Sequence, residues 1–191
     1  AADLQVPATR FAQVQALTHF ARALGAARSG NADAAKADIA KLAELRDKLR
    51  EAKDAYWAEQ VDIQRQVATA FLLAAEGKHD DALKAMSAAA DAEDKTEKSP
   101  VTPGTPQPAR ELYGIMLLER GMAPEALAAF EATIKKEPNR FNAIAGAAKA
   151  AERLGDQAKA RDYYQKLTTL AGNADTVRPD LAAARAFLAK N

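Results

Sequence analysis

Similar residues recur at one fixed interval in the second half of the chain. Four pairs are separated by 34 positions: Gly121 and Gly155, Ala126 and Ala160, Phe130 and Tyr164, Pro138 and Gly172. Each stretch has the character of a helix end, a glycine turn and a second helix with an Ala-x-x-x-aromatic pattern. Ala, the best helix former, is abundant, and Gly is scarce outside these turns. The sequence therefore predicts an all-α fold of repeated helix pairs.

This pattern resembles the tetratricopeptide repeat, whose signature runs W-x₂-L-G-x₂-Y, then A-x₃-F, then P. The third repeat matches it at four positions: Gly114, Ala126, Phe130 and Pro138. In the fourth repeat the same places are held by Ala148, Ala160, Tyr164 and Gly172. Arg110, Tyr113 and Leu117 stand where Trp, Leu and Tyr are usual, so the signature of the first helix is degenerate. The resemblance implies a right-handed α-α superhelix.

Two weaker repeats precede these. The glycine, alanine and apolar positions are held by Gly77, Ala82 and Met86 in one, and by Gly30, Ala35 and Ile39 in the other. The steps between the glycines are 47 and 44 residues, which exceed the repeat by 13 and 10. We predict one domain over 1–191, with repeats at 9–53, 54–94, 107–138 and 139–172 and a capping helix at 177–190.

The excess of 10 residues coincides with a proline-rich stretch at 95–108. Because the same repeat continues on both sides, this stretch is predicted to be an insertion within the array. Pro103-Gly104 suits a type II turn, and Pro108 suits the first turn of the next helix. We expect an ordered excursion along one edge, with a flexible linker as the alternative.

The excess of 13 residues falls in a stretch without Gly or Pro. The favoured interpretation is that two facing helices are both lengthened and meet near Asp54, a candidate N-cap. A single helix over 32–76 is the alternative. Trp57 lies in this pair, where packing between the long helices is favoured over a role as an exposed anchor. Upstream, Thr9 is a candidate N-cap for a helix that runs to about Ser29.

The stretch from Thr96 to Gly114 also resembles segments of uncharacterised bacterial tetratricopeptide-type proteins, in their C-terminal part. The chain begins without Met, which predicts a processed or excised chain. No transmembrane helix or signal peptide is visible in the sequence. A soluble protein of the cytoplasm or the periplasm is expected.

The composition argues against several function classes. The net charge of +1 gives no basic footprint for nucleic acid, and the chain has no cysteine for disulfides or thiolate sites. The two histidines, His19 and His79, are not at metal-ligand spacing, so an exposed or satisfied role is expected for each. The acidic cluster around Asp91 and Glu97 lacks a calcium-loop pattern and is predicted to be a solvated helix end. We expect no enzyme activity, no cofactor and no metal.

The remaining candidate is the surface of the first helices, which line the concave side of such arrays. The predicted partner-binding groove comprises Gln64, Val67, Phe71, Glu111, Ile115, Leu118, Glu119, Asn142, Lys149 and Arg153. Core packing is the competing role for Phe20, Phe71 and Ile115. Chaperone-binding members of the family hold a carboxylate with Lys, Asn and Arg on these helices. Here the corresponding positions, from Val67 to Gly146, have one polar residue, Asn142, so that clamp is absent.

The resemblance thus predicts a scaffold or adaptor that binds a helix or an extended peptide in this groove. Two alternatives remain: a regulatory or substrate-binding module of a larger enzyme or assembly system, and a binder of a small ligand. A closed pocket lined by Trp57 or Phe71 would favour the small ligand. Self-association through an end of the array is also expected to be possible.

Overall fold

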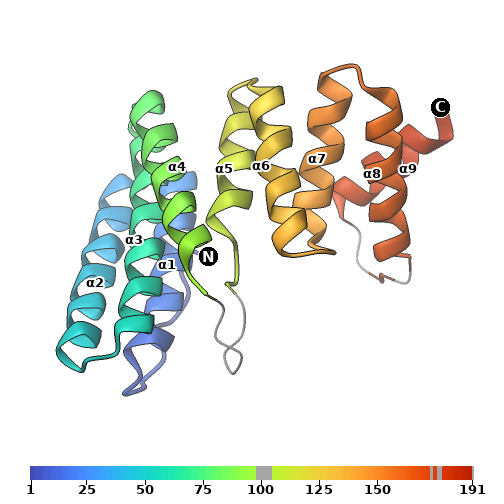
Figure 1. The fold of residues 1–191 in the computed structure, drawn as a ribbon. Coiled ribbons are helices and arrows are strands. Elements are labelled where there is room, and N and C mark those ends of the chain that lie inside the picture. The colour runs from blue at the N-terminus through green and yellow to red at the C-terminus, as the bar shows by residue number, and fades with distance from the viewer. Residues whose placement is uncertain (98–104, 173, 176–177, 191) are drawn as a thin grey trace. The chain divides into compact units, whose positions relative to one another are not determined.

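The computed structural model describes residues 1–97, 105–172, 174–175 and 178–190, and these residues form α-helices and no strand (Figure 1). The helices of this part of the chain are α1 (Ala12–Arg28), α2 (Ala32–Glu51), α3 (Ala55–Ala75), α4 (His79–Lys95), α5 (Ala109–Glu119), α6 (Ala123–Lys136), α7 (Phe141–Arg153), α8 (Gln157–Leu170) and α9 (Pro179–Lys190). The predicted all-α class and the succession of helix pairs are confirmed.

The helices belong to two compact units, which we call the N-terminal unit (1–102) and the C-terminal unit (103–191). In the N-terminal unit each helix packs on the one before it, and α1 also contacts α3. In the C-terminal unit the same holds for α5 to α9, with a contact between α5 and α7. Contacts between near neighbours in the sequence are typical of stacked helix pairs. That the whole chain is a single domain stays a prediction.

The four glycines of the repeat pattern all close the first helix of a pair. Gly30, Gly77, Gly121 and Gly155 have φ between 75° and 78°, the left-handed conformation that glycine adopts at little cost. After Gly121, for example, the Met122 amide donates to the Leu117 carbonyl at 3.0 Å, and the Gly121 amide donates to Leu118 at 3.1 Å. This pair of bonds is the Schellman motif, which satisfies carbonyls at a helix end. The spacing of these glycines therefore marks where the first helix of each pair ends.

The lengthened helices α2 and α3 meet where the sequence indicates. The Asp54 carboxylate accepts a hydrogen bond from the Trp57 amide at 3.2 Å, so Asp54 is the N-cap of α3. The alternative of one helix over 32–76 is wrong, because Lys53 takes a left-handed φ of 59° and ends α2 with a Schellman pair of its own. Trp57 is half-buried, and its ring lies edge-on to Tyr56.

Two details of the first and last helices differ from the sequence expectation. Thr9 is not the N-cap of α1, because the helix begins at Ala12 after Phe11, and the Thr9 hydroxyl instead accepts from the Phe11 amide. Along α9, the sequence spacing places Leu181, Ala184 and Leu188 on one face; Leu181 and Ala184 are buried, but Phe187 rather than Leu188 is the third buried residue.

Part of the proline-rich stretch 95–108 lies outside the described residues, including the predicted turn at Pro103-Gly104 and the order of the insertion. Its last residue is described. Pro108 is the N-cap of α5, and its carbonyl accepts the Leu112 amide at 3.1 Å. This is close to the predicted place in the first turn.

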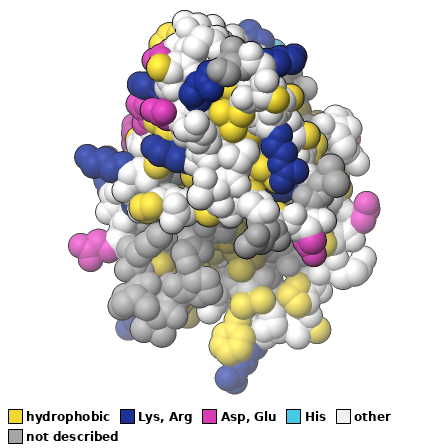
Figure 2. Space-filling model, turned by 90° about the vertical axis from the view of Figure 1, so that its right-hand side faces the viewer, with side chains coloured by type: hydrophobic (Ala, Val, Ile, Leu, Met, Phe, Trp, Pro, Cys, Tyr) yellow, Lys and Arg dark blue, Asp and Glu magenta, His cyan; other side chains and the backbone are white. Residues whose placement is uncertain are grey.

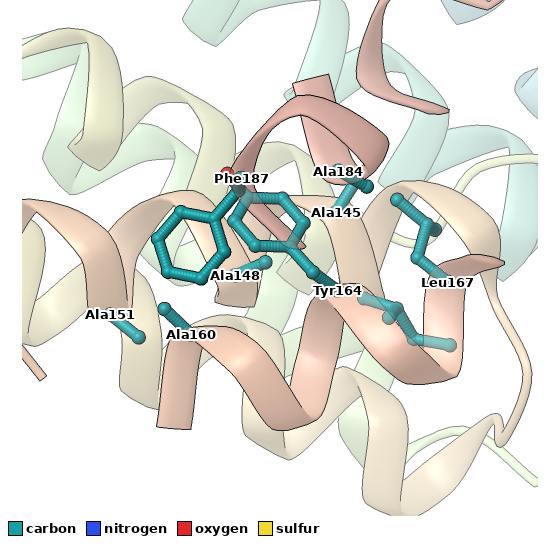
Figure 3. Packing of buried hydrophobic residues seen from close by; sticks show 9 residues of the cluster. Ala145, Ala148, Ala151, Ala160, Tyr164, Leu167, Ala184 and Phe187 are labelled. Atoms are coloured by element: carbon teal, nitrogen blue, oxygen red, sulfur yellow. The ribbon is translucent and has the colours of Figure 1, made fainter. Parts of the chain in front are cut away.

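The core of the C-terminal unit is built from aromatic rings against very small residues. Phe130 of α6 is fully buried, and a Cβ on Gly114 or Gly146 would lie 2.8 or 2.3 Å from its ring atoms. Further along the chain, Tyr164 of α8 and Phe187 of α9 lie with ring centroids 4.8 Å apart, above Ala145 and Ala148 of α7 (Figure 3). The glycines and alanines thus let the helices approach closely around the rings.

Candidate functional site

The predicted groove residues of the N-terminal unit lie on α3 and are buried. Val67 and Phe71 belong to the hydrophobic core, as does Phe20 of α1. They are therefore not open contact residues, and the competing role of core packing holds for Phe20 and Phe71. The physical reason is that α3 packs against α1, α2 and α4, which leaves little of its apolar surface free. Phe71 also carries the Arg28 guanidinium, 4.9 Å from its ring centroid.

Gln64 differs from its neighbours on α3. Its side chain is 8% exposed, and its Oε1 atom is buried without a hydrogen-bond partner. An unsatisfied buried carbonyl costs about 1–3 kcal/mol. Such a group is rare in folded proteins and requires an explanation. Gln64 was predicted for the groove, but the sequence carries no sign that its carbonyl lacks a partner.

In the C-terminal unit, α5 supplies four of the predicted residues, and two of them are buried. Leu118 lies in the core. Glu111 is fully buried, and its carboxylate accepts from Arg140 Nε at 3.2 Å and Nη2 at 3.4 Å. Arg140 also donates to the Pro106 carbonyl and to Glu137. Glu111 therefore ties the start of α5 to the α6–α7 turn, and it is not a groove contact. Ile115 is half-buried, and Glu119 is exposed.

The polar groove residues of α7 contact their own unit. Lys149 forms an ion pair with Asp180 of α9, and Arg153 donates to the Leu118 carbonyl of α5. The Asn142 Oδ1 accepts from Arg178 at 3.1 Å, and the Arg178 guanidinium lies 3.9 Å from the Phe141 ring centroid. These contacts link α5 to α7 and α7 to α9. Lys149 and Asn142 are nevertheless half-exposed and Arg153 is exposed, so they stay predicted contact residues.

A depression of about 600 Å³ lies over α6, the α6–α7 turn, α7 and α8. It is lined by Ile134, Pro138, Asn139, Ile144, Asp162, Tyr163, Gln165, Lys166, Thr169 and Leu170. Neither Trp57 nor Phe71, the residues expected for a small-ligand pocket, lines it. Sequence reasoning assigned no surface to this place. The available signal is the pair Tyr163 and Leu170, two large residues spaced by two turns of α8.

The two tyrosines of α8 have structural partners. Burial and a hydrogen bond to Glu131 at 2.9 Å raise the pKa of Tyr163 to about 12. Burial and a hydrogen bond to Glu152 at 2.7 Å raise the pKa of Tyr164 further. A raised pKa keeps both phenols protonated near neutral pH, so they serve as hydrogen-bond donors. Neither residue has the lowered pKa that a nucleophile or base would need.

The remaining titratable candidates also have structural roles. His19 Nδ1 lies 2.7 Å from Asp38 Oδ1, so this histidine is satisfied by a partner, and His79 is exposed at the start of α4. The prediction that the acidic cluster is solvated needs correction at Glu93, which is buried, whereas Asp91 and Asp94 are exposed. Among the described residues, no group of three or more His, Cys, Asp or Glu is placed to hold a metal ion. Over the same residues, no helix is both long and apolar enough to cross a membrane.

The face that contains α7 to α9 is chemically mixed. Figure 2 looks onto the side that lies at the right of Figure 1, and Lys and Arg side chains lie there among hydrophobic ones. Such a surface offers both cationic and apolar contacts to a partner.

Comparison with known proteins supports the fold. No protein-family model matches the chain, and no curated protein matches it. The solved structure of MamA from AMB-1 is similar, with a TM-score of 0.52 and 13% sequence identity over 93% of this chain and 84% of that one. MamA is a helical repeat protein of the tetratricopeptide type. At this identity the likeness shows that the chain has a tetratricopeptide-like fold.

Proposed function

We propose that this chain is a protein-interaction module, a scaffold or adaptor that binds a helix or an extended peptide along its first helices. Stacked helix pairs present long surfaces without a catalytic constellation. The buried titratable groups fit this role, because Glu111 is paired with Arg140 and Tyr164 donates to Glu152.

The observation that carries the proposal is the unpartnered carbonyl of Gln64. A buried acceptor without a donor destabilises the fold, so a packing role alone would be served better by an apolar side chain such as Met. An extended peptide brings backbone N–H groups that need acceptors. Because the Gln64 Oε1 is covered in this structure, the side chain would turn toward the peptide to accept one of them. Retained strain of this kind is common at functional positions.

The test is a pair of measurements on Gln64→Met, which keeps the size of the side chain and removes the carbonyl. We expect the variant to unfold at a higher temperature, since a buried unsatisfied group is removed. We also expect it to lose partner proteins that the unmodified chain captures from a lysate of the source organism. Gln157→Met, at an exposed position of α8, is the matched control and leaves both quantities unchanged.

Other results would contradict the proposal. If Gln64→Met is more stable and captures the same proteins, Gln64 has no binding role. If it is less stable, its carbonyl has a structural partner. A second variant, Glu119→Lys, changes an exposed residue of α5 and tests the predicted surface of the C-terminal unit separately. Equal capture by both variants and by the unmodified chain would exclude the first helices as the binding surface.

A further inference from the structure

An apolar stripe at the start of α1, which includes its N-cap residue Phe11, is open to solvent. Phe11, Val14 and Leu17 are 48%, 40% and 37% exposed, although all three are large hydrophobic residues. They recur every three residues, so they lie on one side of the helix over about 9 Å of its length. Contiguous exposed apolar residues of this kind mark interaction sites more often than scattered ones do.

The repeat itself indicates what fits this stripe. Moving forward by the 47 residues that separate Gly30 from Gly77 takes Phe11, Val14 and Leu17 to Ala58, Val61 and Gln64 of α3. Those three are 3%, 1% and 8% exposed. They are buried because α3 packs against the preceding pair, α1 and α2. The corresponding side of α1 has no such cover among the described residues. The shape complementary to this surface is therefore another helix.

The charge of the same region indicates which charge a partner helix would carry. Between Asp3 and Asp33 the chain has no acidic residue and three arginines. Arg22 is paired with Asp38 of α2. Arg10 and Arg28 are exposed, and both guanidinium groups lie over aromatic rings: Arg10 lies 5.1 Å from the Phe11 centroid, and Arg28 lies 4.9 Å from the Phe71 centroid. Two exposed cations without a carboxylate partner in the described part of the chain thus lie along α1: Arg10 next to Phe11 at one end of the stripe, and Arg28 at the other end of the helix.

We propose that α1 docks an acidic amphipathic helix of a partner protein, whose apolar residues cover Phe11, Val14 and Leu17 and whose carboxylates meet Arg10 and Arg28. An anionic membrane fits less well, because its recognition takes clusters of about four to eight basic residues. A second copy docking through α9 also fits less well. The exposed residues of α9 between Ala182 and Lys190 are alanines and cations, with no acid.

The test uses three synthetic helical peptides and fluorescence polarisation. The first has Leu at positions i, i+3 and i+7 with Glu on its flanks, the second replaces Glu by Lys, and the third replaces Leu by Ala. We expect the first to bind and the other two to bind at least about tenfold more weakly. Val14→Asp with Leu17→Asp should weaken binding of the first peptide about tenfold or more. Arg10→Glu with Arg28→Glu should weaken it about fivefold.

The controls separate this surface from the others. Leu170→Asp places the same change at an exposed leucine of α8 and should leave peptide binding unchanged. Gln64→Met should also leave it unchanged, so failure of the groove proposal and failure of this one are distinguishable. Equal binding of the Glu and Lys peptides, or loss of binding in Leu170→Asp, would overturn the proposal. So would binding to vesicles rich in phosphatidylserine in preference to the Glu peptide, or dimerisation through α1 in sedimentation experiments that Val14→Asp abolishes.

Discussion

The two units use one repeat with different packing. In the C-terminal unit the ring of Phe130 is fully buried between Gly114 of α5 and Gly146 of α7. In the first repeat of the N-terminal unit the equivalent of Phe130 is Ile39, which is half-buried, and the equivalents of the two glycines are Ala23 and Ala68. The wide ring requires the absence of Cβ atoms, whereas the narrower aliphatic residue tolerates alanine.

The two units also differ in helix length and in polar contacts. The helices α2 and α3 have 20 and 21 residues, whereas α5 to α9 have 11 to 14. The long pair is joined by Arg46, whose guanidinium contacts Asp62 at 2.9 Å, and by the Leu42, Leu45 and Leu49 row. The comparison teaches that the repeat specifies a helix-pair geometry. The space between the helices can be filled in two ways. The C-terminal unit uses an aromatic ring against glycines, and the N-terminal unit uses a row of aliphatic side chains together with an ion pair.

The largest expected effect is that of closing the space beside Phe130. In Gly146→Ala the new Cβ would lie 2.3 to 2.6 Å from three ring atoms, so the ring must move within a close-packed core. Overpacking costs about 3 kcal/mol here, and the better helix propensity of alanine returns about 1 kcal/mol. We expect a net loss of about 2 kcal/mol in the free energy of unfolding, measured by urea denaturation.

A second substitution sharpens this comparison. Phe130→Leu in the Gly146→Ala background removes the clashing ring edge and should recover part of the lost stability. Ala68→Gly in the N-terminal unit is the reciprocal control, and it should cost about 1 kcal/mol, because no ring benefits from the space. If Gly146→Ala is as stable as the unmodified chain, the ring does not depend on glycine.

The predictability of the fold follows the same division. The C-terminal pairs could be predicted because Phe130, Tyr164 and the turn glycines are directly visible in the sequence at one spacing. The junction at Asp54 could be predicted from capping chemistry. Burial of Glu111 and of Val67 could not, because it depends on which helices pack against α5 and α3. The exposed stripe on α1 could not be predicted, because it is recognised by comparing the exposure of its residues with that of the equivalent residues on α3.

A smaller effect on the free energy of unfolding is expected in the turns that end α2 and the first helix of each pair. Lys53 has the left-handed φ that glycine has at the other four turns of this type. A side chain in this conformation costs about 1 kcal/mol. We therefore expect Lys53→Gly to raise the free energy of unfolding by about 0.5–1 kcal/mol and Gly121→Ala to lower it by about 1 kcal/mol. A Cβ on Gly121 would meet no atom within 4 Å, so that change isolates the backbone term. Equal stability of all three chains in urea would contradict the prediction.

The smallest effects are those of pH, and they should fall on opposite sides of neutrality in the two units. Burial alone would raise the pKa of Asp62, but hydrogen bonds from Arg46, Arg65 and Gln66 outweigh it and hold that pKa below its usual value. The stability from Asp62 is therefore fully present above about pH 4, the unfolded value, and is lost as pH falls through the folded pKa. In the C-terminal unit the pKa of Tyr163 is raised to about 12. Its contribution is fully present below about pH 10 and is lost as pH rises through 12.

Melting temperatures should show Asp62→Asn less stable than the unmodified chain at pH 7, with the difference shrinking toward pH 3. Tyr163→Phe should show its deficit at pH 9, shrinking above pH 11. A deficit of Asp62→Asn that persists at pH 3 would mean that its uncharged contacts stabilise the N-terminal unit, and not its ion pairs.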